Sequence, residues 1–227
     1  MDKVAIEKEV RRLQFEVWSQ RELLWPLGVP RIEAMFEPRV VAECLGLHYD
    51  PRERVQTERG SEYEAAGSLD RRTGMLAVSS RFPFHVQRFT AAHEIGHFVL
   101  HPWVGDRVAH RDRPIHGYQL TGRPPLEQEA DYFAACLLVP LKPLVSAFEV
   151  RFGTRKPLPL SETVAFHLGG GSAHHLFTAP RESLQFASAV ARAESFDGRR
   201  FPSLAYCFGV SVSAMAIRLR ESALVVD

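Results

Sequence analysis

Residues 89–101 read Phe-Thr-Ala-Ala-His-Glu-Ile-Gly-His-Phe-Val-Leu-His and contain an H-E-x-x-H motif at 93–97. In a helix, His93 and His97 lie on one face, because four residues make slightly more than one turn. Two imidazoles on one face can bind one metal ion, and Glu94, about 100° further round the helix, can reach a water molecule beside it. The motif therefore predicts a zinc-peptidase centre with Glu94 as the general base.

The residues around the motif favour a helix. Thr90 is a suitable N-cap, and alanines and large apolar residues follow it. Gly96 disfavours helix by about 1 kcal/mol, so we expect the metal face to pack closely against another element. A motif with three fixed residues also occurs by chance, so the prediction depends on finding a third ligand.

The composition is that of an ordinary globular protein, with 45% hydrophobic and 24% charged residues among 227. A net charge of +1 gives no electrostatic reason to expect nucleic-acid or membrane binding. The sequence shows no signal peptide and no apolar run of about 20 residues, so we expect a cytoplasmic protein. The three cysteines are widely spaced, which indicates reduced core residues and not a disulfide framework.

Apolar periodicity predicts helices at 3–24 and 31–45, followed by a polar loop at 47–61. Segments 62–70 and 75–80 flank a turn-rich stretch and predict a hairpin. Zinc peptidases can pair an extended substrate with an edge strand, so segment 75–80 is either such an edge or an ordinary sheet strand. Residues 102–125 are rich in proline and glycine and predict a long loop.

A third ligand is expected on a helix at 125–140, which begins with Pro125 and carries an apolar stripe. Glu127 and Asp131 share a face beside that stripe, where two carboxylates need a compensating partner. We predict Glu127 as the third metal ligand, with Glu129 as the alternative. Asp131 is expected to accept the second N–H group of a metal-bound histidine and so to fix its tautomer. Alternatively, these acidic residues lie in solvent in the first turn of the helix, where negative charge interacts favourably with the helix dipole.

Taken together, the runs at 88–101 and 127–140, preceded by the hairpin residues 67–83, resemble the ImmA/IrrE family of zinc metallo-endopeptidases, which are gluzincin-like. The resemblance covers roughly residues 40 to 140. It implies one zinc ion per chain on His93, His97 and Glu127, although Mn²⁺ or Fe²⁺ would suit the same ligands. It also implies a protein substrate, a helix-turn-helix transcriptional repressor, cleaved in a stress response or in mobile-element or phage regulation.

A donor that stabilises the transition state is not identified by the sequence, and the candidates are Tyr118, Tyr132, His116 and His110. His101 lies eight residues from His93, about 80° off that face and about 12 Å along the helix. We therefore expect His101 to be a hydrogen-bonded histidine behind the ligands or on the surface, and not a ligand.

The expected fold class is α+β. A mainly helical zincin-like domain at 1–152 would carry a small antiparallel or mixed sheet beside the H-E-x-x-H helix. Residues 153–200 are expected to form an insertion or linker with a helix, and 201–227 a helix-turn-helix-like subdomain. Only Arg218 and Arg220 are basic in its second helix, so we expect packing or repressor docking there and no direct DNA binding.

A different class of function would fit part of the same sequence. The chain could be a DNA-binding regulator or an antitoxin-like module with a structural or sensory metal site. A structural zinc site has four protein ligands, whereas a catalytic site keeps one position for water. A fourth ligand such as His110 or His116 would therefore favour this alternative.

Overall fold

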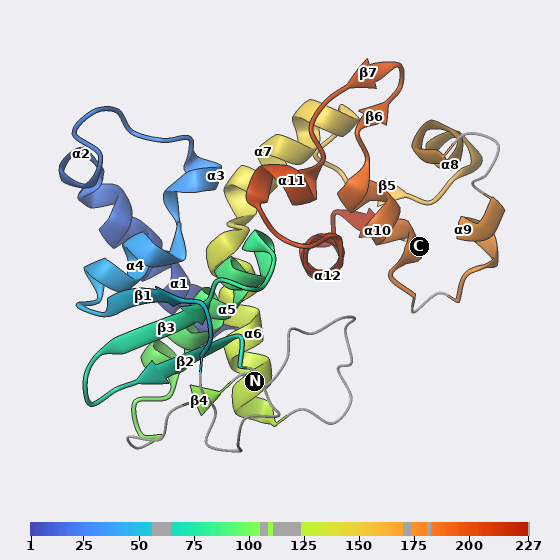
Figure 1. The fold of residues 1–227 in the computed structure, drawn as a ribbon. Helices are drawn as coiled ribbons and strands as arrows, with labels where there is room; N and C mark the ends of the chain where they lie inside the picture. Colours follow the sequence, from blue (N-terminus) through green and yellow to red (C-terminus); the bar gives the residue numbers. More distant parts are fainter. Residues whose placement is uncertain (56–64, 105–108, 111–123, 170–173, 181–182, 227) are drawn as a thin grey trace. The chain divides into compact units, whose positions relative to one another are not determined.

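The computed structural model describes residues 1–55, 65–104, 109–110, 124–169, 174–180 and 183–226. It is mostly helical with small sheets, so the predicted α+β class is confirmed. The chain divides into two compact units, Met1–Leu138 and Val139–Asp227. Figure 1 labels their elements.

The first unit begins with α1 (Lys3–Ser19), whose N-cap Asp2 accepts a hydrogen bond from the Ala5 backbone N–H group. Its buried residues recur every three or four positions, as predicted for an amphipathic helix: Ile6, Val10, Leu13 and Val17. The predicted helix 3–24 is interrupted at Gln20, after which α2 (Arg21–Leu24) forms one short turn.

The predicted helix 31–45 is two helices, α3 (Ile32–Met35) and α4 (Pro38–Cys44). Pro38 explains the break, because proline starts a helix readily but cannot donate the hydrogen bond that would continue one. The predicted loop at 47–61 was wrong in part, because residues 48–52 form strand β1 (His48–Arg52). This strand is largely exposed and contains Pro51, so it lacks the apolar alternation by which strands are recognised.

A four-stranded mixed sheet forms with the order β1-β3-β2-β4. β2 (Gly67–Asp70) and β3 (Met75–Ser79) make the predicted antiparallel hairpin, while β1 pairs with β3 in parallel and β4 (Ala109–His110) pairs with β2. β3 therefore lies inside the sheet. The hypothesis that segment 75–80 is an edge strand for substrate was wrong, because β1 occupies its free side.

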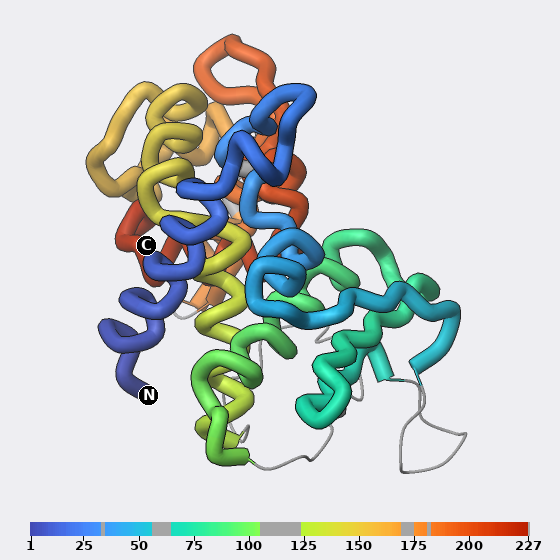
Figure 2. Tube along the Cα trace, turned by 90° about the vertical axis from the view of Figure 1, so that its left-hand side faces the viewer, coloured from blue at the N-terminus to red at the C-terminus, as the bar shows by residue number. Residues whose placement is uncertain are grey.

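Helix α5 (Phe84–Leu100) packs on β2 and β3 with one side and on α6 (Pro125–Leu138) with another. The helix α6 also packs against α1, which runs beside it in Figure 2. The Gln14 side chain on α1 donates a hydrogen bond to the Cys136 carbonyl on α6. α5 is thus enclosed between a sheet and a helix, which explains why eight consecutive residues of this helix, 90–97, are buried.

The second unit contains α7 (Leu141–Phe152), β5 (Leu158–Pro159), α8 (Glu162–Gly169), α9 (His174–Thr178), α10 (Gln185–Arg192), β6 (Ser195–Phe196), β7 (Arg199–Arg200), α11 (Leu204–Phe208), α12 (Val212–Glu221) and β8 (Val225–Val226). Helix α10 packs against α11 and α12, and β5 pairs with β8 in parallel. The fully buried side chains of this unit include Leu144, Phe148 and Leu204.

This division differs from the predicted limits at 152 and 200. α7 belongs to the second unit, where Phe152 packs its ring against those of Phe196 and Phe201. The residues predicted as an insertion at 153–200 and those predicted as a separate subdomain at 201–227 share one core, because α10 packs on both α11 and α12. A sequence read element by element does not reveal such long-range packing.

The last two helices are joined by a tight turn in which Gly209 has a positive φ of 59° and Ser211 caps α12. Arg218 on α12 is buried, and its Nε donates a hydrogen bond to the Val139 carbonyl. One of the two arginines of this helix is therefore part of the interior of the second unit. Within the described residues, no single helix is long and apolar enough to cross a membrane, although α6 and α7 pass that test together as a bent pair.

Candidate metal centre

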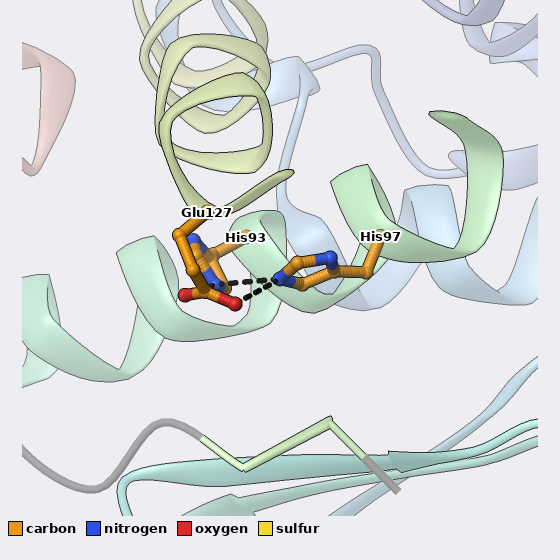
Figure 3. A group of neighbouring side chains, drawn as sticks. All are labelled: His93, His97 and Glu127. Atoms are coloured by element: carbon orange, nitrogen blue, oxygen red, sulfur yellow. Dashed lines mark hydrogen bonds and ion pairs between the residues drawn. The ribbon is translucent and has the colours of Figure 1, made fainter. Parts of the chain in front are cut away.

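Helix α5 carries both histidines of the motif on the side that faces α6. The helix starts at Phe84, directly after Pro83, so Thr90 is an interior residue and not the predicted N-cap. His93 and His97 are 1% and 8% exposed. Figure 3 shows the two imidazoles pointing toward the Glu127 side chain, which comes from α6.

Gly96 sets how closely α5 and α6 approach. A Cβ atom at this position would lie 3.1 Å from Cδ1 of Phe133 and 3.2 Å from both Cα and O of Ala130. Glycine removes that clash and lets the α6 backbone lie directly against α5. The predicted close packing is confirmed, and it brings Glu127, one turn before Ala130, within reach of the two histidines.

The donor atoms of the three predicted ligand residues form a compact triangle, in which each atom lies within 4.8 Å of the others. Nε2 of His93 and Nε2 of His97 are 3.1 Å apart. Of the two Glu127 carboxylate oxygens, Oε2 lies 3.3 Å from Nε2 of His93 and Oε1 lies 3.2 Å from Nε2 of His97. Ligands bound tetrahedrally at about 2.0–2.2 Å from zinc stand roughly 3.3–3.6 Å from one another. Among the described residues, this is the only group of three side chains whose donor atoms could share an ion, and its spacing fits one.

Asp131 lies on the far side of His93. Its Oδ1 is 2.9 Å from Nδ1 of His93. A carboxylate accepts hydrogen bonds, so we assign the proton of the neutral imidazole to Nδ1, which leaves a lone pair on Nε2. Nε2 is the atom in the triangle, and Asp131 thus has the geometry predicted for it.

Glu94 is fully buried, with 0% exposure, on the side of α5 that faces β2. A Cβ atom added to Gly67 would lie 3.8 Å from Cγ of Glu94 and only 2.5 Å from Cγ2 of Thr90, so glycine is needed for this strand to approach. The charge of Glu94 also acts on Arg71, where it opposes the lowering of the arginine pKa by burial. A carboxylate enclosed next to a metal ligand suits a proton-transfer role.

Arg71, in the turn between β2 and β3, was not predicted. Its guanidinium donates hydrogen bonds to the carbonyls of His97, Phe98 and His101 at the end of α5. The His97 carbonyl also accepts the backbone N–H of His101, and the His101 carbonyl accepts that of Val104. The guanidinium therefore adds a cationic donor at the end of α5, where it offsets the negative end of the helix dipole. The sequence shows only a polar turn at this point and gives no signal for this contact.

Burial and contacts shift the pKa values of two candidate ligand residues, His97 and Glu127. Burial lowers the pKa of His97, which favours the neutral imidazole that binds metal. Burial raises the pKa of Glu127, but the His93 and His97 rings, when they carry a proton on Nε2 in the metal-free protein, outweigh it by their hydrogen bonds and charges, and the net shift is downward. Both shifts favour the protonation states that a metal ion requires.

The other predicted residues lie elsewhere. The hydroxyl group of Tyr132 donates a 2.6 Å hydrogen bond to Glu7 on α1, so Tyr132 contacts α1 and does not join the triangle. Glu129 directs its carboxylate to His101, at 3.1 Å, and His101 lies behind His97, as expected for a histidine that is not a ligand. His116, Tyr118 and the side chain of His110 lie outside the described residues.

The comparisons with known proteins agree with this geometry. The family described as Peptidase_M78, IrrE N-terminal-like domain, matches residues 51–169, just over half of the chain. Comparison with curated proteins and with solved structures gave no match. The predicted resemblance to ImmA/IrrE proteins is confirmed, and a metallopeptidase of this kind implies a bound metal. The chain belongs to the IrrE N-terminal-like family of metallopeptidases.

Proposed function

We propose that this chain is a zinc-dependent endopeptidase that cleaves a protein partner. The triangle of ligand atoms from His93, His97 and Glu127, at distances suited to one tetrahedral ion, is the observation that carries the proposal. Two imidazoles and one carboxylate are a donor set typical of catalytic zinc sites in peptidases. Mn²⁺ and Fe²⁺ accept similar ligands, so metal analysis belongs to the test.

The residues of the chain have distinct parts in the reaction. A zinc ion held by the three ligands would polarise the scissile carbonyl group and lower the pKa of a water molecule to about 7. Glu94 accepts a proton from the attacking water as its oxygen bonds to the carbonyl carbon. Glu94 then delivers that proton to the leaving amine as the carbon–nitrogen bond breaks. Its burial keeps competing water away from the carboxylate.

For the substrate we propose a DNA-binding repressor of the helix-turn-helix class. The resemblance of residues 67–101 and 127–140 to ImmA/IrrE proteins supports this choice, and it supports a role in a stress response or in mobile-element or phage regulation. The site itself carries no signal for one sequence at the scissile bond.

The alternative function is a DNA-binding regulator with a structural or sensory metal. Two observations count against it. Arg218 is buried and bonded to the Val139 carbonyl, so only Arg220 of the two arginines in α12 is exposed. In the part of the chain that the structure describes, three side chains and not four converge on the metal position.

The test combines cleavage with metal analysis on the full chain. The zinc-loaded protein is incubated with a helix-turn-helix repressor encoded beside its gene, and fragments are identified by mass spectrometry. We expect one main cut, and Glu94→Gln should slow it about 10²–10⁴-fold while zinc remains bound. Undiminished cleavage by Glu94→Gln would remove Glu94 from the mechanism.

X-ray absorption on the zinc-loaded protein separates the two functions. Three protein ligands and one exchangeable oxygen would support the peptidase. Four protein ligands, without cleavage of any repressor offered, would support the regulator.

A further inference from the structure

The end of α5 carries a third histidine that is engaged with the metal ligands without belonging to them. His101 follows α5 at its C-cap and is 1% exposed. Its Nδ1 is 3.0 Å from Nδ1 of His97, and its Nε2 is 3.1 Å from a carboxylate oxygen of Glu129 on α6. A continuous hydrogen-bonded chain thus runs from Glu129 through His101 to His97.

We infer that Glu129 and His101 form a relay that fixes the tautomer and orientation of the ligand His97. The relay is a positioning device, because neither residue touches the metal position. The inferred relay depends on the proposed metal site. It assigns a role to Glu129 and His101, which are neither proposed ligands nor the proposed general base.

The direction of the hydrogen bonds follows from the carboxylate. Glu129 accepts, so Nε2 of His101 carries the proton and Nδ1 of the neutral ring carries a lone pair. That lone pair accepts the proton on Nδ1 of His97. Nε2 of His97 is then left with a lone pair directed at His93 and Glu127, and this is the form that binds a metal.

The two ligand histidines are supported in different ways. His93 meets a carboxylate directly, since Asp131 lies 2.9 Å from its Nδ1. His97 is one turn further along α5, and an imidazole fills the gap between it and the carboxylate of Glu129. Both hydrogen-bonded chains end at a carboxylate on α6, Asp131 for His93 and Glu129 for His97, and the same helix supplies Glu127. One helix therefore provides a ligand and supports both imidazoles.

The direction of the His101 ring is set by the hydrogen bonds of its two nitrogens. Arg71 donates a hydrogen bond of 3.1 Å to the backbone carbonyl of His101 and so fixes its main chain. The ring of Trp103 packs edge-on against the imidazole, with 5.7 Å between the ring centroids. Trp103 is 70% exposed and adds packing without contributing a hydrogen bond to the relay.

The test measures zinc affinity with a competing chromophoric chelator on the full chain, together with the melting temperature of the metal-free protein. Glu129→Gln keeps the shape but supplies an amide that can donate to His101 and reverse the relay. His101→Phe keeps a flat aromatic ring, slightly larger than imidazole, and removes both nitrogens. We expect each variant to weaken zinc binding about ten- to hundred-fold, the usual effect of losing such an outer partner.

Trp103→Ala is the matched control, because it removes packing from His101 and leaves every nitrogen of the relay. Its zinc affinity should stay within about two-fold of wild type. In addition, ¹⁵N spectra of the imidazoles should show His97 protonated at Nδ1 in the wild type and a mixture of tautomers in the Glu129→Gln variant.

The inference is overturned when Glu129→Gln and His101→Phe bind zinc like the wild type, or when Trp103→Ala loses as much affinity as they do. Because Glu129→Gln is nearly isosteric, it remains informative even where His101→Phe fails to fold. If the inference about the relay is wrong, the wild-type protein still binds zinc and still cleaves its substrate. Failure of the proposed function would instead appear as a wild-type chain that binds no zinc or cuts no substrate.

Discussion

Gly96→Ala tests whether the contact between α5 and α6 sets the geometry of the ligands. The added methyl group would lie 3.1 Å from Cδ1 of Phe133 and 3.2 Å from Cα and O of Ala130. Contacts of this kind normally begin at 3.4 Å. Because two of the three atoms belong to the backbone of α6, the helix as a whole has to retreat by a few tenths of an ångström.

Two opposing effects determine the change in stability. Replacing glycine by alanine inside a helix stabilises by about 1 kcal/mol. Overpacking a tight contact costs about 1–3 kcal/mol. The free energy of unfolding of the metal-free protein should therefore change little or fall by up to about 2 kcal/mol.

Gly96→Ala should affect zinc affinity more clearly than it affects the free energy of unfolding. Glu127 lies one turn before Ala130, so it moves with the part of α6 that retreats. Metal–ligand distances tolerate only about 0.2 Å. We expect zinc affinity to fall at least about ten-fold, which corresponds to about 1.4 kcal/mol.

Chelator competition gives the zinc affinity, and urea unfolding gives the stability of the metal-free protein. Gly153→Ala is the control: a Cβ atom there meets nothing within 4 Å, but φ is +70°, so it should lower stability by about 1 kcal/mol without changing zinc affinity. A Gly96→Ala protein that gains the full helix-propensity benefit and binds zinc like the wild type would refute the reasoning.

Three further predictions concern neighbouring residues. Arg71→Ala should lower the free energy of unfolding by about 1–3 kcal/mol, because three carbonyls at the end of α5 lose a cationic donor. Urea unfolding of the exposed control Arg72→Ala should show a change below about 0.5 kcal/mol, and equal values would contradict us. Asp131→Ala should weaken zinc binding about ten- to hundred-fold in the chelator assay, and an unchanged affinity would exclude its outer-partner role. Burial holds the pKa of His97 below its ordinary 6.5, so the unfolded chain takes up this proton first and the metal-free protein should lose stability as pH falls below about 6.5. Thermal melts between pH 8 and 5 measure this loss, which should be smaller in His97→Gln; a flat profile would contradict it.

The sequence predicted those parts of the site that depend on local periodicity. Four-residue spacing brings His93 and His97 to one face, and the same spacing on a second helix brings Glu127 and Asp131 together. The structure places these side chains around one point. The hairpin before α5 was also recognised, because its strands are apolar and its turn is rich in polar residues and glycine.

What the sequence did not reveal depends on contacts between distant residues. β1 is polar and pairs in parallel with a strand more than twenty residues away, so no local pattern marks it. The sequence does not distinguish Arg71 from Arg72 in the same turn, and only the folded structure shows that Arg71 contacts the end of α5. His101 could be excluded as a ligand from helix geometry, but its pairing with Glu129 required the docking of α6. Tyr132 was a reasonable candidate by position, yet its hydroxyl group is bonded to Glu7.

The separation of the proposed ligands over two helices would couple metal supply to the lifetime of the protein. An ion that binds only when α5 and α6 are docked stabilises the native state by roughly 4 kcal/mol at a free concentration a thousand times its dissociation constant. A cell short of that ion would hold more of the chain in opened forms that degradation enzymes attack. The abundance of the protein should then follow the supply of that ion, with no dedicated sensor required.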